Sequence, residues 1–152
     1  MKCARVFLWF VGLMFIAFGA GFVLAPDIVF PLYTGAPLLT ASAVTDVRAH
    51  NGGLGIGAGL WLLYCLKGHI RFGMVGVAMI HAAIATSRML GFVLDGYPNI
   101  FMVCFLAVEI SLAAGAVLIL RRMQAEQASC RSHSPQQSLP SLTAGRAYPG
   151  RA

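Results

Sequence analysis

Four long apolar stretches organise the sequence, and short turn-forming segments separate the last three of them. They cover about residues 6–25, 48–66, 72–94 and 100–120. A helix needs roughly 20 residues to cross a hydrocarbon core of about 30 Å, and each stretch has about that length. The connections Lys67–Arg71 and Asp95–Asn99 are short, so neighbouring helices must reverse direction. The pattern therefore predicts an all-α fold, a four-transmembrane-helix antiparallel bundle over residues 1–122.

Basic residues flank the predicted helices on one side only. They are Lys2, Arg5, Lys67, Arg71, Arg121 and Arg122. Basic flanks face the cytoplasm in membrane proteins, so both termini are predicted to be cytoplasmic and the protein multi-pass. Residues 123–152 are rich in Ser, Gln, Pro and Gly and predict a disordered cytoplasmic tail.

The composition agrees with a membrane protein. Hydrophobic residues make up 59% of the chain and charged residues only 11%, against about a quarter charged in soluble domains. The formal net charge of +6 comes mostly from the basic flanks and the tail, so we expect no nucleic-acid partner. The expected partner of those flanks is the lipid bilayer, with its anionic headgroups.

Two segments near the start of the chain need interpretation. The first apolar stretch also resembles a secretory signal peptide, but signal cores span about 7 to 15 residues, so we predict a retained helix. The connection Pro26–Val47 is too apolar for a solvated loop, because it contains Phe30, Pro31, Leu32, Tyr33, Leu38 and Leu39. We predict a lid over the outer end of the bundle, with Ser42, Thr45 or Asp46 capping the next helix.

The second apolar stretch is rich in glycine. No strand precedes it and no Lys-Ser or Lys-Thr follows it, so it does not fit a phosphate-binding loop. Gly52, Gly55 and Gly59 have helical spacing and predict close packing of helix backbones. Arg48 and Asn51 share their face and would form a polar cap at its outer end.

Two charges lie deep inside the last two apolar stretches. Arg88 falls roughly 10 Å and Glu109 roughly 15 Å below the outer end of their helices, so an ion pair is within reach. The pair could be a clamp between helices. It could also belong to a polar cavity, with Arg48, Asn51 and Asp95, that binds an anionic or carbonyl-bearing ligand.

His81 shares a helix face with Arg88. His50 lies at a depth that differs from that of His81 by on the order of 15 Å, which argues against bis-histidine haem. A packing role, single-histidine ligation and a proton relay remain open for His81. The cysteines lack metal-ligand spacing and lie at different depths, so we expect no metal site, disulfide framework or cofactor. They are Cys3, Cys65, Cys104 and Cys130.

Four short motifs together resemble a known family. They are Val47–Gly53 (VRAHNGG), Ser87-Arg88, Asp95–Pro98 (DGYP) and Glu109. In order and spacing they are similar to a bacterial family of small four-helix membrane proteins, the domain of unknown function numbered four-three-four-five. The resemblance covers roughly Phe7 to Leu120. It implies a protein of the bacterial cell inner membrane and no established activity, cofactor or partner.

Three functional classes are compatible with this pattern. The protein could bind a small molecule or lipid at the outer polar cluster, as an accessory to a neighbouring pathway. It could be a small proton-coupled transporter subunit, acting as a homo-oligomer or in a membrane complex. It could be a membrane enzyme using Glu109 or His81, but no nucleophile-base pair or metal triad accompanies them. We rank binding or a structural role above transport, and transport above catalysis.

Overall fold

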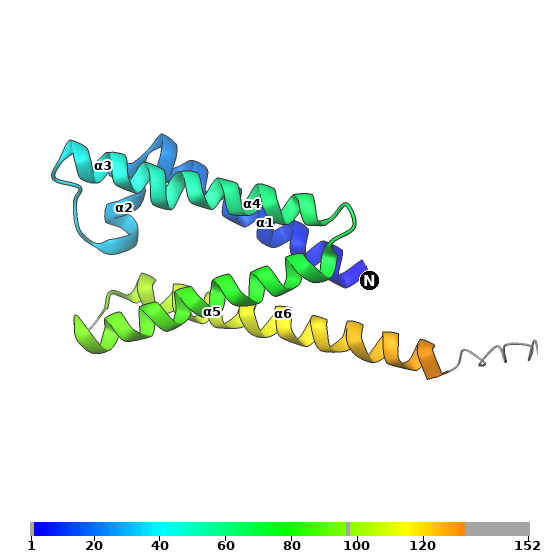
Figure 1. Ribbon diagram of the computed structural model, residues 1–152. Coiled ribbons are helices and arrows are strands. Elements are labelled where there is room, and N and C mark those ends of the chain that lie inside the picture. Colours follow the sequence, from blue (N-terminus) through cyan, green and yellow to red (C-terminus); the bar gives the residue numbers. More distant parts are fainter. Residues whose placement is uncertain (1, 97, 133–152) are drawn as a thin grey trace, which may run out of the picture.

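The computed structural model describes residues 2–96 and 98–132, and that part of the chain contains helices and no strand (Figure 1). The elements are α1 (Lys2–Leu24), α2 (Pro26–Thr34), α3 (Ala41–Val47), the π-helical segment η1 (Arg48–Gly53), α4 (Leu54–Cys65), α5 (Ile70–Leu94) and α6 (Ile100–Ser132). Three helices in this part are long and apolar enough to cross a membrane: α1, α5 and residues Ile100–Ser129 of α6.

The second apolar stretch has a composite structure. It consists of η1 and α4, which continue α3 without a break, because Arg48 and Leu54 at the two junctions keep right-handed helical φ and ψ angles. The π-helical turn ends in Gly52 and Gly53, at the place where the segment packs against α1. The predicted span of residues 48–66 is therefore part of a helix that begins earlier, at Ala41, and has a widened turn at Arg48–Gly53.

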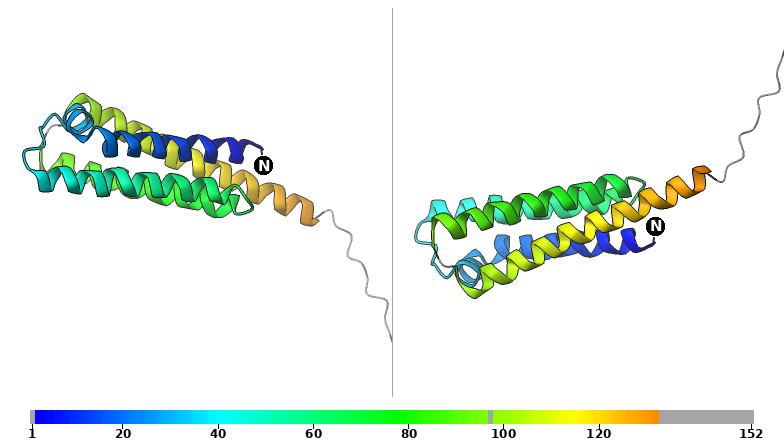
Figure 2. Two further views of the ribbon diagram at one scale, coloured as in Figure 1. Left: turned by 90° about the horizontal axis from the view of Figure 1, so that it is seen from above. Right: turned by 90° about the horizontal axis from the view of Figure 1, so that it is seen from below.

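The helices form two packed pairs, α1 with α4 and α5 with α6 (Figures 1 and 2). Glycines make the first pair close. A Cβ atom on Gly59 would lie 2.5 Å from the carbonyl oxygen of Gly12, and one on Gly52 would lie 3.1 Å from the amide nitrogen of Val23. Gly55 lies opposite Gly19 with a more ordinary separation of 3.4 Å. The helix backbones therefore touch along this stripe.

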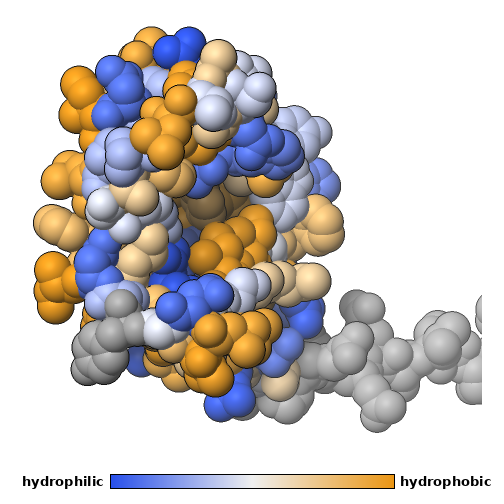
Figure 3. Space-filling view, turned by 90° about the vertical axis from the view of Figure 1, so that its left-hand side faces the viewer, coloured by the Kyte–Doolittle hydropathy of each residue, from blue (hydrophilic) through white to orange (hydrophobic). Residues whose placement is uncertain are grey.

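The two pairs meet at the end that carries the N-terminus and diverge toward α2 and α3 (Figure 1). The hydrophobic core lies where they meet. It contains Ala4, Leu8, Val11, Leu62, Ile70, Met74, Val77, Leu112 and Ala116. Figure 3 views the opposite end of the molecule and shows a hollow in that face.

Two expectations differ from the structure. Helical structure was expected to end near residue 122, but α6 continues to Ser132, because Gln, Ala and Glu after Met123 are good helix formers although they are polar. The rest of the expected disordered tail, residues 133–152, lies outside the described residues. The cap of the helix after the lid is Thr40, whose Oγ1 accepts from the amide of Ala43 at 3.1 Å. Ser42, Thr45 and Asp46, the predicted caps, lie inside α3, because the helix begins earlier than the pattern indicated.

Candidate functional site

The ion pair that the sequence predicted between α5 and α6 is present. Arg88 Nε donates to Glu109 Oε2 at 3.1 Å, and Arg88 Nη2 donates to Glu109 Oε1 at 2.7 Å. The two side chains are only 11% and 10% exposed. The guanidinium and carboxylate planes are thus joined by two parallel hydrogen bonds, so the pair holds the two helices in one register.

Tyr33 completes the cluster from a third element, α2. Arg88 Nη2 donates to the Tyr33 hydroxyl at 2.6 Å, and Arg88 Nη1 contacts the sulfur of Met102 at 2.7 Å. The guanidinium carbon also lies 5.5 Å from the centre of the Tyr33 ring and 6.0 Å from that of Phe105. We refer to Arg88, Glu109 and Tyr33 as the Arg88 cluster.

Aromatic side chains from α1, α2 and α6 surround the Arg88 cluster. The ring of Tyr33 lies 4.9 Å from that of Phe105, and Phe18 lies 5.5 Å from Phe105. Phe22 contacts both Phe18 and Tyr33. Ring faces and edges thus lie beside the polar atoms of the cluster, and these apolar neighbours strengthen its electrostatic interactions.

Local sequence explains how α2 carries Tyr33 to this place. Pro26 begins the helix, and Gly35 ends it with a φ of 81°, a left-handed conformation that glycine adopts readily. Asn99 then ties the end of α2 to the start of α6. Its Nδ2 donates to the Tyr33 carbonyl at 3.4 Å, and its Oδ1 accepts from the amide of Met102 at 3.0 Å. The first part of the predicted lid, α2, is therefore a short helix attached to α6, whereas its last part, α3, continues into η1.

Three residues of the predicted polar cavity do not join the Arg88 cluster. Arg48 and Asn51 lie in η1 and are exposed, because the face of η1 that packs on α1 is the one carrying Gly52. Asp95 ends α5 and is exposed as well. The prediction of one cluster with all five polar residues was wrong in this respect, because these three side chains are exposed. The helix pairs diverge at the end where they lie (Figure 1).

Sequence reasoning missed Tyr33, Met102 and Phe105 as partners of Arg88. Tyr33 stood out only as part of an apolar lid, and the positions of Met102 and Phe105 on α6 carry no signal apart from hydrophobicity. The spacing of Met102, Phe105 and Glu109, three and then four residues, does place them on one helix face. That face can be recognised only after Glu109 is known to meet Arg88.

His81 lies deeper in the bundle than Arg88. It is 2% exposed, its Nδ1 lies 3.0 Å from the carbonyl oxygen of Val77, and its ring meets Phe15 edge to face at 5.3 Å. Glu109, on the neighbouring helix α6, is buried as well. No group of three or more potential metal ligands occurs among residues 2–96 and 98–132. In the same part, Cys3 and Cys104 are exposed free thiols and Cys65 is a buried one.

The fold and site define an all-helical protein with helices fit to cross a membrane and a buried ion pair between two of them. The chain belongs to the family described as Domain of unknown function (DUF4345), whose model matches residues 3–120. The match confirms the family resemblance seen in the sequence motifs. Comparisons with curated proteins and with solved structures found no match.

Proposed function

We propose that this protein is an integral protein of the bacterial inner membrane that binds a small molecule or lipid at the Arg88 cluster. In this proposal four spans form an antiparallel bundle. Three of them are α1, α5 and α6, and the remaining one, second in chain order, is η1 with α4. Support comes from three helices of sufficient length and from the packing of η1 and α4 along α1. The basic flanks at the end that carries the N-terminus support cytoplasmic termini.

The observation that carries the proposal is the composition and depth of the Arg88 cluster. Arg88 precedes the end of α5 by six residues, which corresponds to a depth of about 9 Å. A charged network at that depth is expensive to insert into hydrocarbon and often marks a functional site. The helix pairs diverge between this level and the α2 end, where Figure 3 shows the hollow.

The cluster indicates the chemistry of the ligand. The Arg88 side chain has five N–H donors. Described residues accept from four of them: both on Nη2, the one on Nε and one on Nη1. The second N–H of Nη1 has no acceptor among these residues. The rings of Tyr33 and Phe105 lie 5.5 and 6.0 Å from the guanidinium carbon, and Phe18 packs against both rings. This combination suits an amphiphile that presents a carbonyl or anionic oxygen to Arg88 and an apolar body to the rings.

Native mass spectrometry of the full chain in mild detergent tests the proposal. We expect a bound species on the wild-type protein that is absent from the double variant Arg88→Gln, Glu109→Gln. Its binding should be weaker in Tyr33→Phe, which keeps the aromatic ring but loses the hydroxyl group. Arg48→Gln is the matched control, because it removes an exposed charge outside the cluster. A bare wild-type protein, or equal retention on a folded Tyr33→Phe and double variant, would refute ligand binding and leave a clamp in an accessory protein.

A second candidate function is that of a small proton-coupled transporter subunit. One observation favours it: His81 and Glu109, on facing helices, are the two buried polar residues among the described ones, with 2% and 7% of the whole residue exposed. Together with Arg88 they could form a proton path through the outer half of the bundle. Pyranine-loaded proteoliposomes would show proton flux with the wild-type protein and none with Glu109→Gln if this function is correct.

A further inference from the structure

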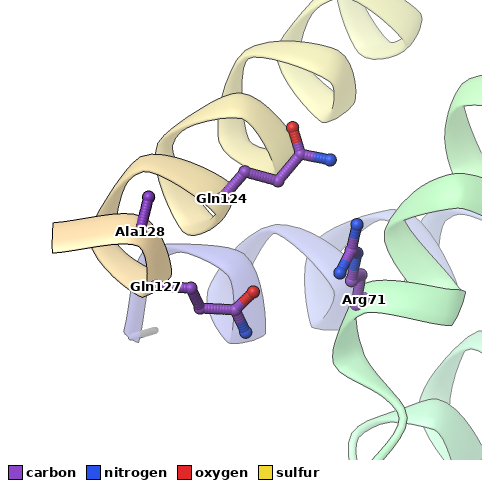
Figure 4. Close-up of a pocket in the computed structure, with 4 residues that line it drawn as sticks. All are labelled: Arg71, Gln124, Gln127 and Ala128. Carbon is purple, nitrogen blue, oxygen red and sulfur yellow. The ribbon is translucent and has the colours of Figure 1, made fainter. Parts of the chain in front are cut away.

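A second polar site lies at the opposite end of the molecule from the Arg88 cluster. The start of α5 and the end of α6 form a pocket of about 460 Å³ lined by Arg71, Gln124, Gln127 and Ala128 (Figure 4). In Figure 4 the Gln127 side chain extends from α6 toward Arg71, and the Gln124 side chain leaves the same helix toward that side. We call it the Arg71 pocket.

The spacing of the lining residues on α6 explains the pocket. Gln124, Gln127 and Ala128 are three and four residues apart, so they share one helix face. Ala128 is small and leaves room between the longer side chains. Glu126, the acidic residue of this segment, is two positions from Gln124 and therefore points to another face. The pocket thus has amide groups and a guanidinium but no carboxylate in its lining.

Arg71 carries an uncompensated charge. Unlike Arg88, it forms no ion pair and no side-chain hydrogen bond with another residue of the described ranges. It is the second residue of α5, next to the positive end of that helix. Glutamine amide groups supply N–H donors beside it. A positive group, a helix N-terminus and two neutral donors together favour an anion with several oxygens.

The depth of the pocket matches the headgroup layer of a bilayer. The long apolar run of α6 ends at Leu120, where Arg121 and Arg122 follow, and Gln124 and Ala128 lie about 6 and 12 Å beyond Leu120 along the helix. The headgroup layer extends about 5 to 8 Å beyond the hydrocarbon on each side. The continuation of α6 beyond the apolar region therefore places the amides at and just beyond the level of phospholipid phosphates, opposite Arg71 at the start of α5.

We infer that the Arg71 pocket binds a phosphate group, with Arg71 pairing with phosphate oxygens and Gln124 and Gln127 donating from their amides. The phosphate can be that of an anionic phospholipid or free inorganic phosphate, because both present the same oxygens. The volume of the Arg71 pocket is within the range of pockets that hold small molecules, about 300 to 1,000 Å³. This site is independent of any ligand at the Arg88 cluster.

The test uses the full chain in mild detergent and two probes. Native mass spectrometry measures binding of phosphatidylglycerol, with phosphatidylcholine as the zwitterionic reference, and calorimetry measures binding of inorganic phosphate. Arg71→Gln removes the charge, and Ala128→Leu fills the pocket without changing charge. Arg122→Gln and Ala125→Leu are the matched controls, because they make the same changes at neighbouring exposed positions outside the lining. All four positions are exposed, so folding should be unaffected.

We expect Arg71→Gln and Ala128→Leu each to weaken phosphate binding by about tenfold or more, and both controls to leave it unchanged. Binding of phosphatidylglycerol alone would identify a lipid headgroup as the ligand, whereas binding of inorganic phosphate that displaces the lipid would identify the free ion. The inference is overturned if neither probe binds, if Arg122→Gln weakens binding as much as Arg71→Gln, or if Ala128→Leu has no effect.

Discussion

The energetic coupling between Arg88 and Glu109 is the sharpest test of the site. Replacing Glu109 by Gln leaves the guanidinium charge buried with Tyr33 as its strongest remaining partner, which should cost about 3 kcal/mol of the free energy of unfolding. Arg88→Gln should cost less, because an isolated carboxyl can take up a proton whereas a guanidinium keeps its charge. The double variant removes both charges and should be more stable than the sum of the single effects predicts.

We expect a coupling energy of about 2 kcal/mol, in the upper part of the range for contacting residues. The assay is reversible unfolding of the purified chain in mixed micelles of mild detergent and dodecyl sulfate, for the wild type, both single variants and the double variant. Arg48→Gln, an exposed charge in η1, should change stability by less than about 0.5 kcal/mol. A coupling energy below about 0.5 kcal/mol would refute the reasoning, because the pair would then contribute no more than an exposed one.

Three further predictions follow from single contacts. Gly59→Ala should destabilise the protein by about 1 to 3 kcal/mol, because a Cβ atom there would lie 2.5 Å from the Gly12 carbonyl oxygen. Gly57→Ala, with open space around it, should be neutral or stabilising in the same unfolding assay, and equal effects would contradict the packing. Tyr33→Phe should cost about 1 kcal/mol, measured likewise, and no loss would mean that its hydroxyl is dispensable. A membrane-impermeant maleimide should label Cys3 in inverted vesicles and spare it in intact spheroplasts if the N-terminus is cytoplasmic; the reverse pattern would contradict the orientation.

Hydrophobic pattern alone determined much of the architecture. The apolar stretches predicted helices close to α1, α5 and most of α6, because a helix that must cover about 30 Å of hydrocarbon needs a long uninterrupted apolar run. Reckoning depth along two helices also predicted that Arg88 and Glu109 could meet, since the rise per residue is constant. Both inferences depend on one-dimensional quantities, length and depth, that a sequence contains.

Only the tertiary structure decided which polar residues share a site. Arg48, Asn51 and Asp95 lie at suitable depths but are on the surface, whereas the hydroxyl oxygen of Tyr33, 55 residues from Arg88 in sequence, accepts a hydrogen bond from Arg88. Rotation of each helix about its axis, the divergence of the two pairs and the return of α2 over α6 determine these neighbours. Such features arise from packing between distant segments, through Gly52 and Gly59 against α1 and Asn99 against α2, and local sequence pattern does not encode them.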